Sequence, residues 1–173
     1  MTDRNAFEVA FRRLFGEQYA SLFRYLDRLS GDTDLATDLA QEAFVRLYRR
    51  GEIPDDVRAW LGTVASNLFR DERRKSQRHL RLLAAQPPEL TLGAPAPAPD
   101  AGTISAERRD AVRSALDDMP LRDRQMLLLR HEGYSYREIA HALGVPETGI
   151  GTQLIRASAA FRTAFLEKHS APE

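Results

Sequence analysis

The chain has 173 residues, and its 25 Lys and Arg are balanced by 25 Asp and Glu, so its formal net charge is zero. It has no cysteine, which excludes disulfides and thiolate metal sites. No apolar run approaches the roughly 20 residues that span a membrane. We therefore expect a cytoplasmic protein without membrane insertion, made of one domain or two small ones.

Helical periodicity runs through the first half of the chain. Apolar residues recur at helical spacing from Phe7 to Leu29, and Gly31 with Asp32 predicts the end of that helix and the start of a second one, which runs to about Arg50. A third helix is predicted after a short loop, with Trp60 on its apolar stripe. Nothing alternates at period two over a useful length, so no sheet is predicted.

The far end of the third predicted helix is strongly basic. Within twelve positions that hold only two acids, six basic residues occur: Arg70, Arg73, Arg74, Lys75, Arg78 and Arg81. A solubilising face is one interpretation, but this density favours contact with nucleic acid. The chain as a whole is neutral and should hold DNA weakly by itself, because phosphate neutralisation dominates non-specific affinity.

The segment from about Leu83 to Thr103 changes character, because it holds five prolines and no basic residue. Such a composition excludes regular helix and predicts an extended tether. We expect an all-α protein of two small helical domains: residues 1–82, then a flexible, acidic, Pro- and Ala-rich linker over 83–104, then residues 105–173.

The second domain contains a predicted helix-turn-helix. Pro120 separates its first two helices, and Ser135 with Glu138 matches a capping box at the start of the third. Gly144 suits a turn that needs positive φ, and Ile150 falls where the last helix, which runs to about Lys168, needs an apolar anchor. An ordinary α-hairpin is the alternative, but cap, turn and anchor in one register favour a motif that places a helix in the DNA major groove.

Two helical modules in this order resemble bacterial sigma factors of the extracytoplasmic-function group of the sigma-70 family. Residues 34–44 resemble the helix that binds the coiled coil of the RNA polymerase β′ clamp, and residues 58–74 resemble the helix that opens the −10 promoter element. Residues 116–157 resemble the domain that reads the −35 element. The resemblance covers nearly all of residues 7–166.

The resemblance implies three sets of contact residues. For core polymerase they are Asp38, Leu39, Gln41, Glu42, Phe44 and Arg46. For −10 DNA they are Arg58, Asn67, Arg70, Arg73 and Arg74. For −35 DNA they are Arg137, Thr148, Gly149, Gly151, Thr152, Gln153 and Arg156. It implies core RNA polymerase (its β′ clamp and β flap), promoter DNA and a separate anti-sigma factor as partners, and no cofactor, metal or catalytic residue.

Two stretches depart from the family pattern. Gly151 and Gln153 stand where cations are usual, and Ser158 stands where an arginine is usual, so we expect few phosphate contacts from this helix. Glycine inside a helix costs about 1 kcal/mol relative to alanine, so Gly151 fits either close approach to DNA or packing against the neighbouring helix. The loop before Trp60 is short, which leaves base specificity at −10 open.

Three other functions are weighed against this one. An enzyme is disfavoured because the histidines form no metal pattern: Ser135 stands where a zinc protease that began at His131 would need its second histidine. A stand-alone helix-turn-helix regulator would leave residues 7–82 unexplained. The third alternative is a regulator that has sigma-like modules but does not initiate transcription. Only a transcription assay distinguishes it from a sigma factor.

Overall fold

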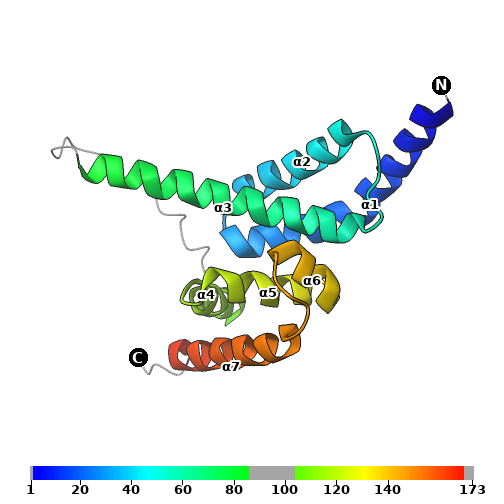
Figure 1. Cartoon of the computed structure of the whole chain (residues 1–173). Helices are drawn as coiled ribbons and strands as arrows, with labels where there is room; N and C mark the ends of the chain where they lie inside the picture. The colour runs from blue at the N-terminus through cyan, green and yellow to red at the C-terminus, as the bar shows by residue number, and fades with distance from the viewer. Residues whose placement is uncertain (1, 86–103, 170–173) are drawn as a thin grey trace.

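The structure, a computed structural model, describes residues 2–85 and 104–169. The described residues form seven α-helices and no strand, as predicted (Figure 1). The helices are α1 (Thr2–Ser30), α2 (Thr33–Arg50), α3 (Val57–Ala84), α4 (Ile104–Asp117), α5 (Leu121–His131), α6 (Tyr136–Leu143) and α7 (Ile150–His169). The prediction of an extended tether falls mainly on residues 86–103, which lie outside the described residues.

The N-terminal domain consists of α1, α2 and α3, which pack on one another. The joint between α1 and α2 is the predicted one: Gly31 has φ 66°, and the Asp32 side chain accepts a hydrogen bond from the Leu35 N–H at 3.0 Å. Leu26, Leu47 and Leu61, one from each helix, are almost fully buried in its core. The predicted helical module is therefore confirmed.

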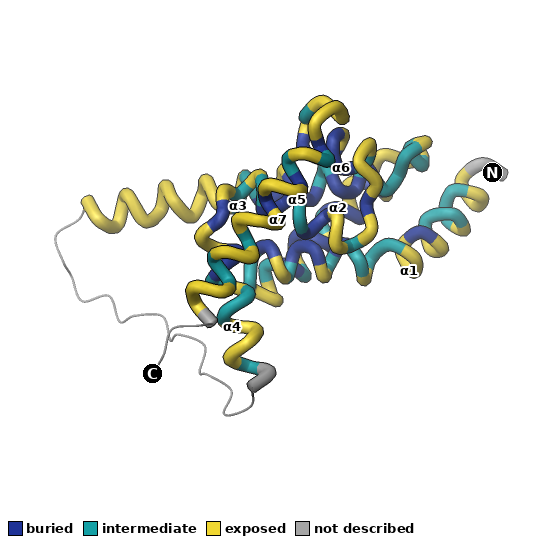
Figure 2. Tube along the Cα trace, turned by 90° about the horizontal axis from the view of Figure 1, so that it is seen from below, coloured by how far each residue is buried: buried dark blue, intermediate teal, exposed yellow. Residues whose placement is uncertain are grey.

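The second half of α3 leaves this core. Its first half is buried through Leu68 and Phe69, but residues 73–85 are exposed on every side, and the helix projects from the body (Figure 2). It ends at Ala84 rather than before Leu83, so the first two residues of the predicted linker are helical. No helix-breaking residue occurs before Pro87, which accounts for the extension.

The C-terminal domain consists of α4 to α7. Pro120 stands at the N-cap of α5, as its fixed φ favours, and separates α5 from α4. Met126, Leu129, Ile139 and Ile150 form a core that is closed to solvent. None of the described helices combines the length and apolar character that crossing a bilayer requires.

The two domains are packed against each other, which the sequence did not predict. Helix α3 lies on α6 and α1 lies on α5 (Figure 1). Gly62 of α3 is buried where α6 crosses it: a Cβ built on Gly62 would lie 3.2 Å from the Ala142 Cβ and 3.0 Å from Cε1 of Tyr134. One continuous set of buried residues therefore runs through both domains. We call this arrangement the closed form.

Candidate functional site

The helix-turn-helix forms as the sequence predicts. The Ser135 hydroxyl accepts a hydrogen bond from the Glu138 N–H at 3.2 Å, and the Ser135 N–H donates to the Glu138 carboxylate at 2.6 Å. Gly144 closes α6 with φ 65°, and Ile150 is fully buried as the anchor of α7. The capping box, the turn and the anchor are each confirmed.

The start of α7 presents small polar side chains to solvent. Thr148, Gly149, Thr152 and Arg156 are exposed, and Gly149 has φ 96° just before the helix begins. Gly151 faces the neighbouring helix instead, because a Cβ built there would lie 3.4 Å from the Tyr136 ring. Of the two interpretations of Gly151, packing against a neighbouring helix therefore has a direct structural basis.

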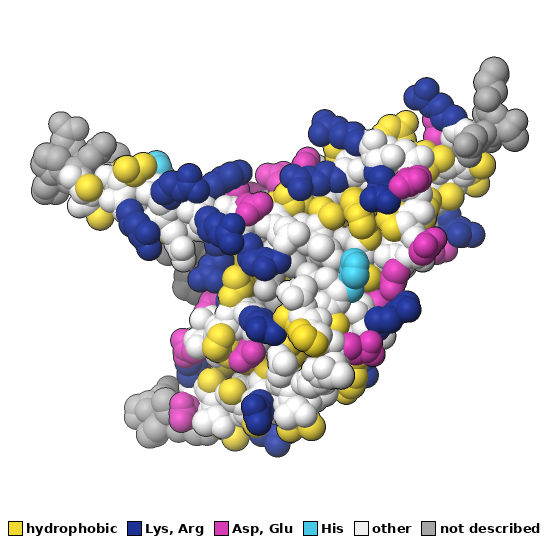
Figure 3. Space-filling view, viewed as in Figure 1, with side chains coloured by type: hydrophobic (Ala, Val, Ile, Leu, Met, Phe, Trp, Pro, Cys, Tyr) yellow, Lys and Arg dark blue, Asp and Glu magenta, His cyan; other side chains and the backbone are white. Residues whose placement is uncertain are grey.

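The basic segment of α3 is accessible along its length. Arg73, Arg74 and Lys75 are exposed, and the last two form only weak surface pairs, Arg74 with Asp71 at 3.5 Å and Lys75 with Glu72 at 3.6 Å. Lys and Arg side chains line the projecting helix in Figure 3. Surface ion pairs of this kind contribute little to stability, so these cations are available to a polyanion.

The outer face of α2 carries polar side chains, and the inner face of the same helix carries buried apolar ones. Asp38, Gln41 and Arg46 are exposed, and the Glu42 carboxylate accepts a hydrogen bond from Arg46 at 2.8 Å. This hydrogen bond lowers the pKa of Glu42 and keeps it charged. Leu39 and Phe44, in contrast, are 8% and 2% exposed. These two side chains support the face from below and are not accessible to a partner.

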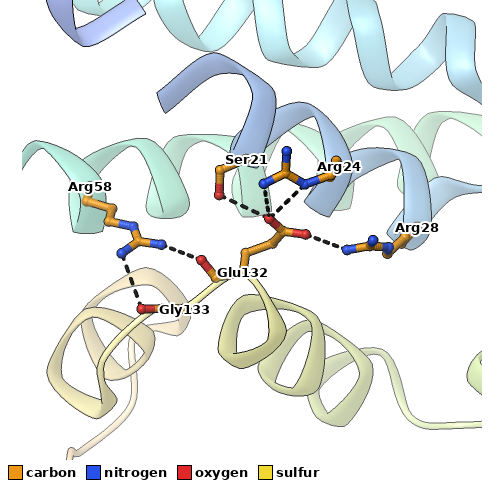
Figure 4. A network of polar contacts seen from close by, with 6 residues as sticks. All are labelled: Ser21, Arg24, Arg28, Arg58, Glu132 and Gly133. Atoms are coloured by element: carbon orange, nitrogen blue, oxygen red, sulfur yellow. Dashed lines mark hydrogen bonds and ion pairs between the residues drawn. The ribbon is translucent and has the colours of Figure 1, made fainter. Parts of the chain in front are cut away.

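A carboxylate from the C-terminal domain is bound by the N-terminal domain (Figure 4). The Glu132 carboxylate accepts hydrogen bonds from Arg24 at 2.9 and 3.2 Å, from Ser21 at 3.2 Å and from Arg28. Arg58 donates to the backbone oxygens of Glu132 and Gly133. The Glu132 side chain is only 3% exposed, so these donors take the place of water around its carboxylate.

Further polar contacts surround this one. The Arg137 guanidinium lies 3.0 Å from the Asp56 carboxylate, and the Thr63 hydroxyl lies 3.2 Å from Nδ1 of His141. Within the interface, the Tyr25 hydroxyl is hydrogen-bonded to Ser66 at 2.9 Å. Burial raises the pKa of Tyr25 to about 12, so the phenol stays neutral.

Comparison with known proteins identifies the two domains. A family model described as Sigma-70 region 2 matches residues 14–79, and one described as Sigma-70, region 4 matches residues 109–161. The ECF RNA polymerase sigma factor SigL of Mycobacterium tuberculosis is 32% identical over 170 residues, covering 90% of this chain and 89% of SigL. The chain belongs to the extracytoplasmic-function (ECF) sigma factors.

Two other sigma factors are similar to the chain. The ferric citrate uptake sigma factor FecI of Escherichia coli is 28% identical over 165 residues, covering 91% of this chain and 92% of FecI. Among solved structures, the sigma factor RpoE of Bartonella quintana, in complex with the anti-sigma factor NepR, superposes with a TM-score of 0.67. It is 21% identical and is matched over 95% of this chain and 99% of that one. The two-domain sigma fold is therefore confirmed.

The predicted contact residues of this ECF sigma factor lie in three kinds of environment. Most lie on open surface, including Gln41, Arg73 and Thr152, whereas Leu39 and Phe44 are buried. Arg58 and Arg137, predicted to contact −10 and −35 DNA, make contacts between the two domains in the closed form, and Arg137 remains 74% exposed there. Glu132 and its α1 donors were not predicted as functional at all, because their partners lie more than 100 residues away in the chain and leave no local pattern.

Proposed function

We propose that this ECF sigma factor binds core RNA polymerase through α2 and directs promoter-specific initiation with α3 at the −10 element and α6–α7 at the −35 element. The observation that carries this is the presence of both sigma regions in one chain, the first with an exposed basic helix and the second with an exposed recognition-helix start. RNA synthesis is the polymerase's own reaction, so the sigma factor supplies recognition rather than catalysis.

The polar face of α2 is proposed to meet the β′ clamp. Asp38, Gln41, Glu42 and Arg46 carry both charge signs on neighbouring turns, which suits a charged partner helix. The Arg46 guanidinium already lies 2.8 Å from the Glu42 carboxylate. The partner must therefore contact both side chains of this ion pair or replace one of them in it. The buried side chains of Leu39 and Phe44 beneath it fix the orientation of this face.

The β flap is proposed to dock on the C-terminal domain. A groove of about 1180 Å³ lies between α4, α5 and α7 and is also bordered by the end of α1. Leu116, Leu127 and Phe161 supply apolar lining, and arginines such as Arg109 and Arg162 supply a basic rim. An amphipathic segment with acidic flanks is the ligand that such a groove accommodates best.

The −10 element is proposed to lie along α3. Opening a duplex requires that unstacked bases and single-strand phosphates be held, for which amides and arginines are suited. Asn67, Arg73 and Arg74 are exposed on this helix in the closed form. Arg70 is half-buried and hydrogen-bonds Asn67 and the Ser66 carbonyl, so it also orients the amide.

The −35 element is proposed to meet the start of α7. Thr148, Thr152 and Arg156 are exposed there, and the backbone N–H groups of a helix N-terminus bind phosphate oxygens. Few cations accompany them, so binding by this domain alone should be weak. Attachment to polymerase then supplies the missing affinity by raising the local concentration of DNA.

Promoter engagement is proposed to require that the domains separate. In the closed form Arg58 donates to the carbonyls of Glu132 and Gly133 and is withheld from DNA, whereas Arg137 is paired with Asp56 but is still 74% exposed. A separate anti-sigma factor is proposed to control this step, in line with the complex in which the similar fold of RpoE was solved. We place the protein in the cytoplasm, where core polymerase is found.

The proposal is tested by copurification with core polymerase followed by run-off transcription. Gln41→Ala with Glu42→Ala should lower affinity for core at least tenfold while leaving thermal melting nearly unchanged, because both side chains reach solvent. The matched control is Glu17→Ala with Gln18→Ala, which removes the same pair of residue types from α1. Wild-type affinity in the α2 variant would reject the assigned face, and absence of transcription by wild-type protein with core would reject the function.

A further inference from the structure

The Glu132 carboxylate occupies a site that belongs entirely to the N-terminal domain. Ser21, Arg24 and Arg28 lie at positions i, i+3 and i+7 of α1, hence on one face of that helix, and Arg58 reaches the same place from α3 (Figure 4). We call these four residues the arginine notch. The C-terminal domain contributes the Glu132 carboxylate, which Ser21, Arg24 and Arg28 bind, and the two backbone carbonyls that Arg58 binds beside it.

The notch binds its occupant as an anion site does. Arg24 directs two nitrogens, Nε and Nη2, at one carboxylate oxygen, while Arg28 contacts the other oxygen. The same planar donors match phosphate as well as carboxylate. The Arg24 and Arg28 side chains remain 51% and 40% exposed even in the closed form, so the notch opens to solvent on its outer side.

Arg58 has a guanidinium N–H, at Nε, that is not used in a hydrogen bond with the described residues. Its two terminal nitrogens bind the Glu132 and Gly133 carbonyls, its guanidinium lies 4.4 Å from the centroid of the Tyr134 ring, and its buried Nε has no hydrogen-bond partner among the described residues. All of these partners leave with the C-terminal domain. Separation of the domains would therefore free three guanidinium groups close together, with planar donors that match a phosphate or a carboxylate.

We propose that the arginine notch is a binding site for a phosphate of the promoter DNA strand, and that Glu132 is its built-in competitor. The proposal rests on the proposed function, because it places DNA along α3. Arg58 and Arg73 are separated by fifteen residues of α3, or about 22 Å at helical rise. About six stacked nucleotides span that length. The notch thus extends the basic track of α3 at its other end.

Competition by Glu132 keeps DNA out of the notch while the domains are closed, and it leaves the basic segment of α3 accessible. Because Glu132 is tethered to the notch by the chain, its effective concentration there is in the millimolar range. Binding of DNA to the notch and closure of the domains are then mutually exclusive. Each weakens the other by the same factor.

The test uses the full-length protein and a fluorescent thymidine oligonucleotide, which carries phosphates but no promoter sequence. Glu132→Gln removes the competing charge with little change in shape. Gly62→Leu separates the domains by a different route, since its side chain must displace Tyr134 and Ala142, and it leaves the notch intact. Both variants should bind the oligonucleotide about tenfold more tightly than wild type, and small-angle scattering should show a larger radius.

Removing the notch should cancel this gain. Arg24→Ala with Arg28→Ala, added to either opening variant, should return affinity to the wild-type level and should reduce the slope of log K against log salt by about 0.7, as expected for one phosphate on a single strand. The matched control is Arg12→Ala with Arg13→Ala, which removes two exposed charges from α1 away from the notch. The control should keep most of the gain.

Several results would overturn the proposal. These are opened variants that bind no more tightly, a gain that persists without Arg24 and Arg28, an equal loss in the Arg12 and Arg13 control, or closed domains in both opening variants. Run-off transcription by wild-type protein with core polymerase keeps this distinct from the proposed function. If transcription is normal and the notch variants have no effect on oligonucleotide binding, only the notch is rejected.

Discussion

A disulfide between α3 and α6 should lock the closed form and block initiation. The chain has no cysteine of its own, so Gly62→Cys with Ala142→Cys introduces the only pair. The Cβ positions lie 3.2 Å apart, and disulfides need about 3.5–4.5 Å. The two helices must therefore separate by a few tenths of an ångström, which also relieves the 3.0 Å approach of the new Cβ to Tyr134.

The size of the effect follows from the loop that the bond closes. Residues 62 and 142 are about 80 positions apart, for which chain entropy gives a stabilisation of about 4–5 kcal/mol. Crowding at the interface offsets about 1–3 kcal/mol of this. We therefore expect the melting temperature of the oxidised protein to exceed that of the reduced protein by roughly 2–16 °C.

Run-off transcription with core polymerase, with and without reductant, is the decisive measurement. The oxidised protein should be at least tenfold less active, because Arg58 stays engaged between the domains, and reductant should restore activity. A non-reducing gel verifies the bond, and the two single-cysteine variants control for the substitutions. Full activity of the oxidised protein would refute the reasoning, since the closed form would then be competent for initiation.

Three further predictions concern single side chains. Tyr25→Phe should lower the free energy of unfolding by about 1 kcal/mol near neutral pH, because Ser66 loses its partner. Since burial raises the pKa of Tyr25 to about 12, the stability due to its neutral phenol is complete below about pH 10 and is lost as the pH rises towards 12. Between about pH 10 and 12 the free energy of unfolding in urea should therefore fall less steeply in the variant than in the wild type. An equal fall in both proteins would contradict the buried neutral phenol. Gly151→Lys fits sterically, since the nearest atom to its Cβ is in the Tyr136 ring at 3.4 Å. Titrations at two salt concentrations should show tighter binding to all −35 duplexes and less preference among them. Unchanged affinities would place α7 outside the DNA major groove. Ile150→Ala empties a fully buried position and should cost about 2–5 kcal/mol in urea unfolding; a loss under 1 kcal/mol would show that this residue does not anchor the motif.

The helices and the helix-turn-helix were predictable because their signals are local. The capping box needs only Ser135 and Glu138, the turn needs only Gly144, and the α1–α2 joint needs only Gly31 and Asp32. Each signal lies within a few residues of the backbone that it shapes. A single sequence contains that information in full.

The packing of the two domains was not predictable in the same way. Periodicity places Tyr134 and Ala142 on apolar faces but does not say which helix covers them, and nothing marks Gly62 as their neighbour. Arg58 fitted a DNA contact equally well on charge alone, although in the closed form it donates to backbone carbonyls. Contacts between residues far apart in the chain depend on the whole fold.

The separation of Glu132 from its partners also sets an order of events during protein synthesis. Arg24 precedes Glu132 by 108 residues, and chains elongate at about 5–20 residues per second. The arginines therefore leave the ribosome roughly 5–20 seconds before the acid that neutralises them. For that interval the nascent N-terminal domain exposes Arg24 and Arg28 with no internal anion to cover them, while it is still attached to a ribosome made largely of RNA.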